Sequence, residues 1–312
     1  MKNIVYDCDP GHDDAMALFE ALAHPEEINI LGVTTVGGNQ TLENVTKNAQ
    51  HILSAAHSKI ELASGQAQPL VKEFYPATNA HGDSGMDGHD FPAKDGNYPI
   101  SSLNAVTFLH KKIQSADDLV TIVATGPLTN IALLLKTFPE VKDSIDKIII
   151  MGGGLDHGNI TKGAEFNIWT DPEAAKIVFT SGIPMVMAGL DVTERAYFTE
   201  DELQELDKKG PISSITYDLL SYYYKSGKQF GFKNSPVHDL CAMAYLIDPT
   251  LFTGHTYSVD VVTDDSEARG MTIADKRKLP ENKNSTLVLL DVDRERYRDL
   301  FFQAIEKLDQ EN

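Results

Sequence analysis

Short apolar runs rich in β-branched residues alternate with helical stretches between residues 2 and 188 of this 312-residue chain. The runs are continuously apolar, as expected for strands that are buried on both faces of a parallel sheet. We therefore expect an α/β fold with an open, mostly parallel central sheet flanked by helices. The predicted strands are 2–6, 28–36, 119–124, 147–151 and 184–188, and the predicted helices are 13–24, 42–57, 172–180 and one that begins at Pro127.

The last third of the chain has a different pattern. Residues 200–247 are mainly helical. Three further strands and a final helix are predicted at 257–262, 271–274, 286–291 and from Arg294 onward. No repeat, low-complexity segment or linker divides the sequence, so we expect a single domain over residues 1–312.

Two long segments, 69–99 and 152–167, have no regular hydrophobic pattern. Both are rich in glycine, histidine, aspartate and asparagine. Loops of this length inside a compact domain are often functional. We therefore expect both segments to contribute to a site.

The composition argues against nucleic acids and membranes as binding partners. The formal net charge is −19 at pH 7, and such a surface repels nucleic-acid phosphates and anionic lipid headgroups. The N-terminus shows no signal peptide, and no apolar run approaches membrane-spanning length. Without an export signal, Cys8 and Cys241 are expected to be free thiols in a reducing compartment. We expect a cytoplasmic protein with a small-molecule substrate, and neither a nucleic-acid polymer nor a membrane as a partner.

The most informative segment is residues 7–14, which reads DCDPGHDD. It directly follows the first predicted strand, and ligands of open α/β sheets bind at the carboxyl ends of strands. Its four close carboxylates repel one another, so they need a cation or raised pKa values, and a hard cation suits their oxygen atoms. Helix capping could account for Asp13 and Asp14. It does not account for Asp7 and Asp9, which precede the turn.

Two other interpretations of this segment are weaker. An EF-hand needs a glycine at its sixth position and a glutamate at its twelfth, whereas Gly11 stands at the fifth and no glutamate follows at the twelfth. A phosphatase that uses Asp7 or Asp9 as its nucleophile would need a hydroxyl residue shortly afterwards. Residues 10–12 read PGH and supply none.

Three more segments carry candidate ligand or catalytic groups at the end of a predicted strand or the start of a predicted helix. Residues 237–240 (VHDL) open an apolar helix, where a His-Asp pair is usually a cap. Residues 124–130 (ATGPLTN) turn from a strand into a helix, and their carbonyl groups are candidate ligands for a hard cation. The glycines of 151–154 (MGGG) let the backbone approach a ligand closely. Asn159 and the segment 165–167 (EFN) suit a polyhydroxyl group, although a plain surface loop explains them equally well.

Taken together, these segments resemble the inosine-uridine-preferring nucleoside hydrolase family. The aspartate segment 7–14 resembles the highly specific signature of that family, and the other similarities follow in the family's order along the whole chain. They are 33–39 (VTTVGGN), 125–130 (TGPLTN), 151–154 (MGGG), 164–167 (AEFN) and 237–239 (VHD).

The resemblance implies a calcium-dependent enzyme. The carboxylates of Asp9, Asp14 and Asp239 and the backbone carbonyl of Thr125 would bind the ion. Two ribose hydroxyls and a water would complete the high coordination number that calcium accepts. Asp9 would also be the general base for that water, which Asn39 would help to orient.

The resemblance also implies a sugar pocket. Asp13, Asn159, Glu165 and Asn167 would hold the ribose hydroxyls, and Met151 would line the pocket. Cleavage of an N-glycosidic bond passes through an oxocarbenium-like sugar. Carboxylates and amide oxygens around the ring would stabilise its developing positive charge.

The leaving base needs a proton, and two histidines are candidates to supply it or to contact the base. His238 is the stronger candidate for the general acid, because imidazole can carry a proton near neutral pH. His81 would also lie near the base. Segments 222–224 (YYY) and 230–233 (FGFK) are expected to form a lid whose aromatic rings stack on the base or pack in the core. Trp169 receives no role in stacking.

The sequence leaves several alternatives open. Purine or pyrimidine preference is not decided, and the resemblance suggests a homo-oligomer, a dimer or a tetramer. Two rival function classes are a calcium- or ribose-binding protein without catalysis and a phosphatase-like hydrolase. The first is disfavoured because a binding protein would not need Asp9, Asn39 and His238 together.

Overall fold

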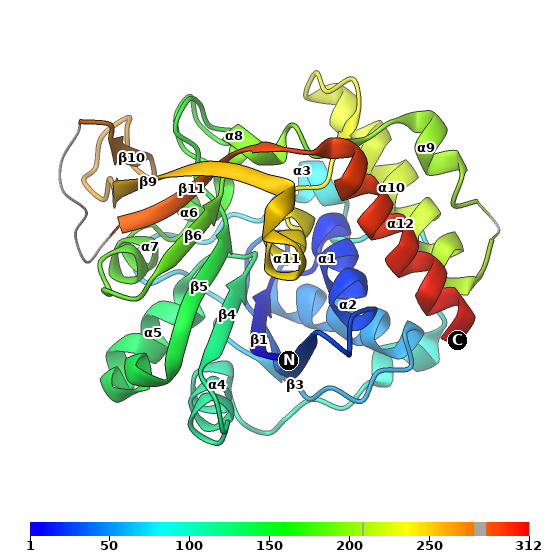
Figure 1. Cartoon of the computed structure of the whole chain (residues 1–312), viewed down its shortest axis with the longest axis horizontal. Coiled ribbons are helices and arrows are strands. Elements are labelled where there is room, and N and C mark those ends of the chain that lie inside the picture. Colours follow the sequence, from blue (N-terminus) through cyan, green and yellow to red (C-terminus); the bar gives the residue numbers. More distant parts are fainter. Residues whose placement is uncertain (208, 278–284, 312) are drawn as a thin grey trace.

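The computed structural model describes residues 1–207, 209–277 and 285–311. Its centre is a nine-stranded sheet in the order β10-β9-β11-β6-β5-β4-β1-β2-β3 (Figure 1). Strands from β3 to β11 along this order pair in parallel, and β9 pairs antiparallel with both β10 and β11. The strands are β1 (Lys2–Cys8), β2 (Ile28–Thr35), β3 (Leu62–Ser64), β4 (Val120–Ala124), β5 (Ile145–Met151), β6 (Met185–Ala188), β9 (Phe252–Val261), β10 (Thr272–Asp275) and β11 (Ser285–Val292).

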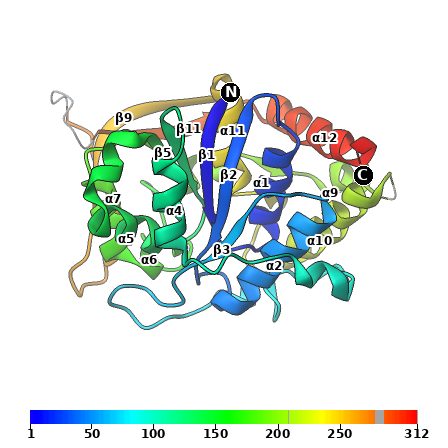
Figure 2. The ribbon, with the colours of Figure 1, turned by 90° about the horizontal axis from the view of Figure 1, so that it is seen from below.

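Helices cover both faces of this sheet, as Figure 2 shows. One hydrophobic core joins the sheet to α1, α2, α10, α11 and α12, and a second core joins the opposite face to α4, α5 and α7. Burial of the strands on both faces explains why their sequences are apolar throughout. These helices are α1 (His12–Leu22), α2 (Leu42–Ala55), α4 (Ala105–Gln114), α5 (Thr129–Thr137), α7 (Pro172–Phe179), α10 (Pro211–Gln229), α11 (Leu240–Ile247) and α12 (Arg294–Glu311).

Shorter elements connect the main ones. The strands β7 and β8 form a separate antiparallel pair that leads into the start of α11. Among the described residues, no helix is both long and apolar enough to span a membrane. The short elements are α3 (Thr78–His81), η1 (Ala93–Asn97), η2 (Pro139–Ser144), α6 (Phe166–Thr170), β7 (Tyr197–Phe198), α8 (Leu190–Thr193), α9 (Glu200–Gln204), β8 (Ser235–Pro236) and η3 (Pro249–Leu251).

The predicted mostly parallel α/β architecture is confirmed, with differences at the ends of elements. The helix predicted from Pro127 begins at Thr129, and the strand predicted from residue 257 begins at Phe252. The sequence prediction missed β3 and α4. β3 has only three residues, which is too few to show a pattern. α4 is amphipathic, so its apolar residues are spaced along the helix and do not form a continuous run.

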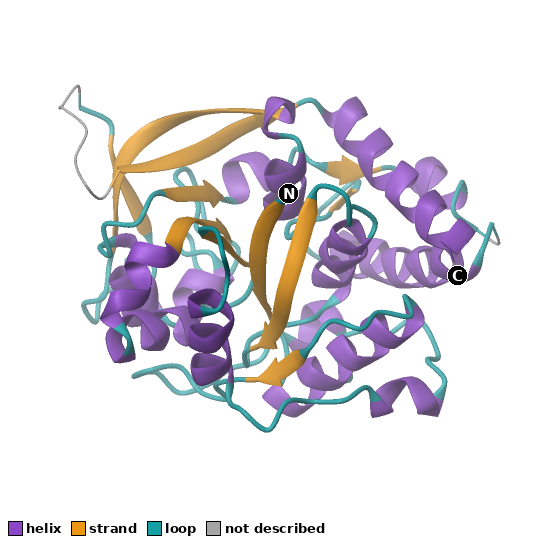
Figure 3. Cartoon of the chain, turned by 60° about the horizontal axis from the view of Figure 1, so that its bottom comes forward, coloured by secondary structure: helices purple, strands orange, loops and turns teal. Residues whose placement is uncertain are grey.

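Parallel strands place their carboxyl ends on one edge of the sheet, where loops gather (Figure 3). Asp7 near the end of β1 is level with Thr34 of β2 and Ala124 of β4. The segments that follow β1, β2, β4 and β5 therefore meet in space. Most of the candidate residues from the sequence lie in these segments, whereas His81 follows β3 and His238 and Asp239 follow β8.

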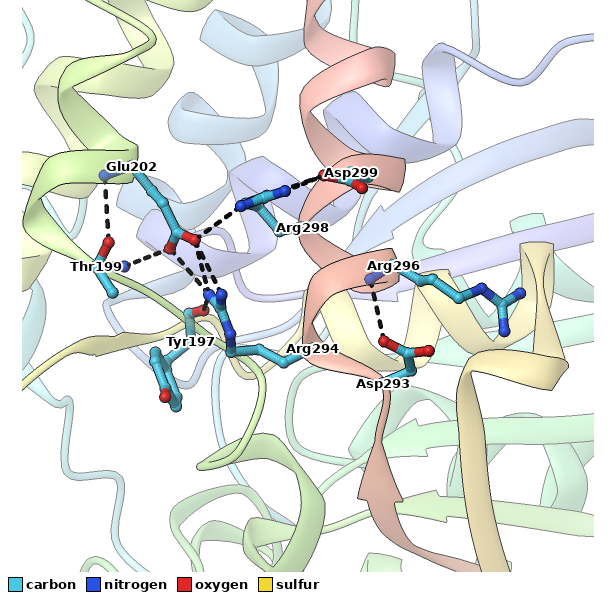
Figure 4. Close-up of polar contacts among 8 residues, drawn as sticks. All are labelled: Tyr197, Thr199, Glu202, Asp293, Arg294, Arg296, Arg298 and Asp299. Carbon is cyan, nitrogen blue, oxygen red and sulfur yellow. Dashed lines mark hydrogen bonds and ion pairs between the residues drawn. The ribbon is translucent and has the colours of Figure 1, made fainter.

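An ion-pair cluster ties α9 to α12 (Figure 4). Glu202 accepts hydrogen bonds from the Arg294 guanidinium at 2.9–3.0 Å and from Arg298 at 3.2 Å. Its carboxylate also completes a capping box with Thr199, whose backbone N–H it accepts at 2.9 Å. Arg294 further donates to the carbonyl of Tyr197 in β7, so the cluster supports the β7–β8 pair.

Candidate active site

A cavity of about 480 Å³ opens at the carboxyl edge of the sheet. It is lined by ten of the twelve site residues that the sequence predicted: Asp13, Asn39, His81, Thr125, Met151, Asn159, Glu165, Asn167, His238 and Asp239. The other two, Asp9 and Asp14, are fully buried and have no place in the cavity lining. The described residues that line the cavity include no lysine or arginine.

Hydrogen bonds hold both carboxylate oxygens of Asp14. Its Oδ2 accepts the backbone N–H of Gly11 at 3.1 Å, which caps the start of α1. Its Oδ1 accepts the Thr125 hydroxyl at 2.7 Å. Because the Thr125 hydroxyl hydrogen is used in the hydrogen bond to Asp14, the Tyr6 hydroxyl must be the donor to Thr125 Oγ1, at 2.9 Å. Asp14 is therefore both a helix cap and part of the polar cluster.

Asp9 has one fixed oxygen and one free oxygen. Its Oδ2 accepts the backbone N–H of Asn39 at 2.7 Å, while its Oδ1 is buried without a partner among the described residues. Glycines pack closely around this carboxylate, since a Cβ on Gly38 would overlap Oδ2 and one on Gly126 would lie 2.7 Å from Oδ1. Side chains at these two positions would displace Asp9, so the glycines are needed here.

The carboxylates of Asp13, Asp14 and Asp239 form the tightest acidic group, with one oxygen from each within 4.8 Å of the others. Burial, followed by the charge of Asp13, raises the pKa of both Asp14 and Asp239. Burial and then the charge of Asp14 raise the pKa of Asp9 well above its usual range. A bound cation would relieve this repulsion, since it favours the ionised form of each group.

The donor set fits a hard divalent cation. All candidate ligands are oxygen atoms, and Asp9 Oδ1 and Asp13 Oδ1 are buried with no hydrogen-bond partner among the described residues. Such buried polar atoms are rare unless a ligand or water satisfies them. The Thr125 carbonyl also faces this region, although it already accepts the Asn167 side-chain amide at 2.6 Å. A carbonyl oxygen has a second lone pair for another contact.

The loop after β5 brings amide and carboxylate groups to the opposite wall. Glu165 caps α6 by accepting the N–H groups of Asn167 and Ile168, and it also accepts that of Gly153 at 2.9 Å. Burial raises the pKa of Glu165 to about 7, although these N–H bonds oppose the rise. Asn159 fixes the same loop through its side-chain oxygen, which accepts the N–H of Phe166.

Histidines lie on the wall of the cavity above the carboxylates. His238 directly precedes Asp239, and its Nδ1 lies 2.7 Å from the Thr193 hydroxyl. His81 is the last residue of α3, and its ring stacks against Tyr223 with centroids 5.4 Å apart. Burial lowers the pKa of both His81 and His238, so both rings are mainly neutral at pH 7.

Part of the cavity wall was not foreseen from the sequence as individual residues. The cavity lining includes Tyr223, Phe230 and Phe232, which come from the two predicted lid segments. The sequence did not indicate which aromatic residues of those segments would face the cavity. His157 and Glu194 also line the cavity and contact each other at 3.0 Å. His157 lies in the predicted functional loop 152–167, whereas no sequence signal marks Glu194.

Asp7 and Trp169 lie away from the cavity. Asp7 does not line it, and its Oδ1 accepts Thr34 Oγ1 at 2.5 Å and Asn130 Nδ2 at 2.8 Å. Trp169 is also absent from the lining and packs against Lys72. Asp7 is therefore a structural carboxylate under the site.

Comparison with known proteins decides the family. The model of the inosine-uridine preferring nucleoside hydrolase family matches residues 4–299. The chain belongs to this family. It is thus a hydrolase of N-glycosyl compounds, and the resemblance inferred from the aspartate signature is confirmed. The family is metal-dependent, in agreement with the acidic group at the cavity.

Individual relatives of this nucleoside hydrolase agree. The pyrimidine-specific ribonucleoside hydrolase RihA of Photobacterium profundum is 43% identical over 97% of this chain and 98% of its own length. RihA of a Shewanella species is 42% identical over 97% and 96%. A purine-preferring ribonucleoside hydrolase from Gardnerella vaginalis superposes with a TM-score of 0.93 at 32% identity, with both chains fully covered. A plant nucleoside hydrolase gives 0.89 at 31% identity, with 99% of each chain covered.

Proposed function

We propose that this nucleoside hydrolase is calcium-dependent and cleaves pyrimidine ribonucleosides to ribose and the free base. The single observation that supports the reaction best is the group of buried carboxylates at the floor of a cavity that has histidines on its wall. Carboxylates would stabilise the positive charge on the sugar in the transition state, and a histidine would donate a proton to the departing base.

Asp9, Asp14 and Asp239 would hold the ion through their carboxylates, together with the Thr125 carbonyl. Asp13 belongs to the same tight acidic group and could reach either the ion or a ribose hydroxyl. The all-oxygen set and the flexible coordination of calcium favour Ca²⁺ over Mg²⁺, which demands octahedral geometry. When bound, the cation would supply Lewis acidity that makes a water easier to deprotonate.

Asp9 would take the proton of that water. The Asn39 N–H holds Asp9 Oδ2, so Oδ1 is the oxygen available as the base. The Asn39 side chain, which donates to Asp14 Oδ2 at 3.3 Å, would help to fix the nucleophile.

The ribose would lie between the carboxylates and the loop after β5. Asp13 from one side and Asn159, Glu165 and Asn167 from the other would bind its hydroxyls, with Met151 beneath the sugar. Three of these side chains are held before substrate binds: Glu165 and Asn159 accept backbone N–H groups, and Asn167 Nδ2 donates to the Thr125 carbonyl. Preorganised dipoles and charges of this kind stabilise a developing positive charge without rearrangement.

In its protonated form, His238 would give a proton to the leaving base and become neutral. The Thr193 hydroxyl occupies its Nδ1, so Nε2 is the nitrogen that remains for the substrate. The RihA relatives are the reason for preferring pyrimidines, because they are 42–43% identical to this chain. The purine-preferring structural relative is 32% identical. The lid aromatics, with Phe230 half exposed at 51%, offer a ring surface to either type of base.

A substrate panel tests this proposal. Ribose release is measured with uridine, cytidine, inosine and adenosine, first after chelation and then after Ca²⁺ or Mg²⁺ is returned. We expect kcat/KM for the pyrimidine ribonucleosides to exceed that for the purines, with Ca²⁺ restoring more activity than Mg²⁺. Activity that is unchanged by chelation would remove the metal from the proposal, and purine turnover at equal efficiency would remove the base preference.

A pair of variants separates the metal site from general effects of removing a buried charge. Asp14→Asn should lower both bound calcium and turnover. Glu20→Gln is the matched control, because Glu20 lies in the same helix α1 and is equally buried, but it pairs with His24 and is not part of the acidic group. Burial raises the pKa of Glu20, so a neutral amide should be tolerated there. Equal losses in both variants would contradict the assignment of Asp14.

A further inference from the structure

His12, which lies inside the aspartate signature, makes a chain of contacts that the proposed mechanism does not use. Its Nε2 lies 2.7 Å from the backbone carbonyl oxygen of Asp87. Its Nδ1 lies 3.2 Å from Nδ1 of His81. His81 lines the cavity, whereas His12 does not. The chain thus runs from a backbone carbonyl, through a buried imidazole, to a histidine of the site.

The carbonyl group decides the direction of both hydrogen bonds. A carbonyl oxygen only accepts, so the proton between Asp87 and His12 must be on His12 Nε2. A neutral imidazole has one N–H, which leaves a lone pair on His12 Nδ1. The facing nitrogen, His81 Nδ1, must then carry the N–H and donate it to His12. The remaining nitrogen of neutral His81, Nε2, is left with a lone pair.

We propose that His12 is a positioning residue that fixes the tautomer of His81, so that His81 presents an unprotonated Nε2 to the substrate. This inference rests on the proposed function for its catalytic meaning. In this form His81 accepts a hydrogen bond from an N–H or O–H group of the bound nucleoside. His238 then remains the residue that donates a proton to the base. The two histidines of the cavity therefore have different roles.

This series of hydrogen bonds ends at the backbone carbonyl of Asp87. It therefore orients His81 and does not carry protons away. A backbone carbonyl cannot take up a proton from His12 under ordinary conditions, and the chain thus lacks the terminal base that a relay would need. Hydrogen bonds that set the tautomer of an active-site histidine in this way are common. The usual partner of such a histidine is a carboxylate or a carbonyl, whereas here His12 lies between His81 and the Asp87 carbonyl.

The Asp87 carbonyl is held in place by its own loop. The Asp87 carboxylate accepts the backbone N–H groups of Asp83 and Ser84, both at 3.1 Å. Gly82 has a φ of +80°, and a Cβ at this position would overlap Asp87 Oδ2. A glycine is therefore needed for the loop to close around Asp87. The loop is built to present this carbonyl at a fixed position.

The ring of His12 is fixed as well. It stacks on Tyr222 with centroids 5.2 Å apart and an interplanar angle of 4°, and on Tyr223 at 5.4 Å and 10°. It also lies 5.4 Å from the ring of His81. His12 is fully buried in this stack, and burial favours its neutral form. The geometry leaves the ring little freedom to flip its two nitrogens.

The tautomer can be read directly by ¹⁵N NMR of histidine-labelled, calcium-loaded protein, with signals assigned by the loss of peaks in His81→Ala. We expect His81 Nδ1 to have the shift of a protonated nitrogen and Nε2 that of an unprotonated one. His12→Phe keeps an aromatic ring but removes both hydrogen bonds, so His81 should move to the Nε2–H form. His12→Asn keeps an acceptor near the position of Nδ1 and should preserve the wild-type tautomer.

A kinetic cycle tests whether His12 acts through His81. His12→Phe should lower kcat for uridine roughly 10–100-fold, as for other residues that orient a catalytic group, with KM and bound calcium little changed. His12→Asn should recover most of the loss. In a His81→Ala background, the same His12→Phe change should cost less than about twofold, because two residues that act together are not additive.

The outcomes separate this inference from the proposed function. Losses that multiply in the double variant, or an Nε2–H His81 in the wild-type protein, would overturn the role of His12. If the protein released ribose from none of the nucleosides, the proposed function would fail. The NMR experiment would still decide the tautomer, because its readout does not depend on turnover.

Discussion

The Glu202 cluster between α9 and α12 allows a quantitative prediction about stability. Glu202 is only 8% exposed and accepts hydrogen bonds from two arginines and a backbone N–H. Burial alone raises the pKa of Glu202, but Arg294, the Thr199 N–H and Arg298 outweigh it and lower the pKa to about 2. Glu202→Gln keeps the shape and the capping hydrogen bond and removes the charge. We expect this variant to be less stable at pH 7.

The size of the loss follows from the pKa. A fall from 4.5 to about 2 corresponds to at most roughly 3.5 kcal/mol, since one pKa unit is about 1.4 kcal/mol. The arginine side chains are 23% and 31% exposed, so water screens part of this interaction and about 2 kcal/mol is expected. The folded-state pKa is depressed, so the contribution is complete above pH 4.5 and is lost as the pH falls towards 2. The difference from Gln should be roughly halved near pH 3.

Urea unfolding followed by circular dichroism, at fixed protein and calcium concentrations, measures this difference at pH 7 and pH 3. Asp299→Asn is the matched control, because Asp299 pairs with Arg298 of the same cluster but its side chain is 52% exposed. Its loss should stay below about 1 kcal/mol. The reasoning is refuted if Glu202→Gln and Asp299→Asn lose equal stability at pH 7. It is also refuted if the loss for Glu202→Gln does not shrink at low pH.

Three further predictions concern the site. A 2′-deoxyribonucleoside should be cleaved far less efficiently than its ribonucleoside, by ~10⁴-fold in a favourable case, because a site built for a hydroxyl is left unpaired without it; matched kcat/KM values for uridine and 2′-deoxyuridine check this. His238→Ala should reduce uridine turnover by ~10²–10⁴-fold but largely spare p-nitrophenyl riboside, whose phenolate leaves without a proton; equal losses would make His238 structural. Asp9→Ala should damage both substrates alike, and a selective effect on uridine would move Asp9 away from water activation.

The sheet was predictable from the sequence because burial on both faces leaves a continuous apolar run in each central strand. β1, β2 and β4–β6 all carry such runs. The edge strand β3 does not, because its three residues gain their place from pairing with β2 rather than from their own pattern. Strand pairing at a sheet edge is a tertiary interaction, and the local sequence contains little information about it.

The site shows the same division. The aspartates after β1 could be found because carboxylates so close along the chain repel one another unless a cation or bound protons offset their charge. Glu194 could not be found, because it reaches the cavity from the end of α8 and nothing in its neighbourhood distinguishes it from a surface glutamate. The carboxylates of Asp13, Asp14 and Asp239 lie close together in the structure. The sequence alone could not place Asp13 in this group, because the direction of its side chain depends on how α1 packs.

Three of the four aspartates of the signature have one oxygen held by a donor and one oxygen without a partner among the described residues. Asp7 and Asp9 each give one oxygen to neighbouring hydrogen-bond donors, and in each the second oxygen has no partner among the described residues. Asp13 follows the same pattern, with a long contact of 3.5 Å from the Tyr223 hydroxyl to Oδ2 and a free Oδ1. The fixed oxygen sets the position of the carboxylate, so little conformational freedom remains to be lost when a ligand reaches the free one. Backbone N–H and hydroxyl donors hold these buried carboxylates in place, and the described cavity lining contains no cationic side chain. The repulsion among the carboxylates therefore remains for a bound cation to offset, and the cavity has space for an ion and a sugar.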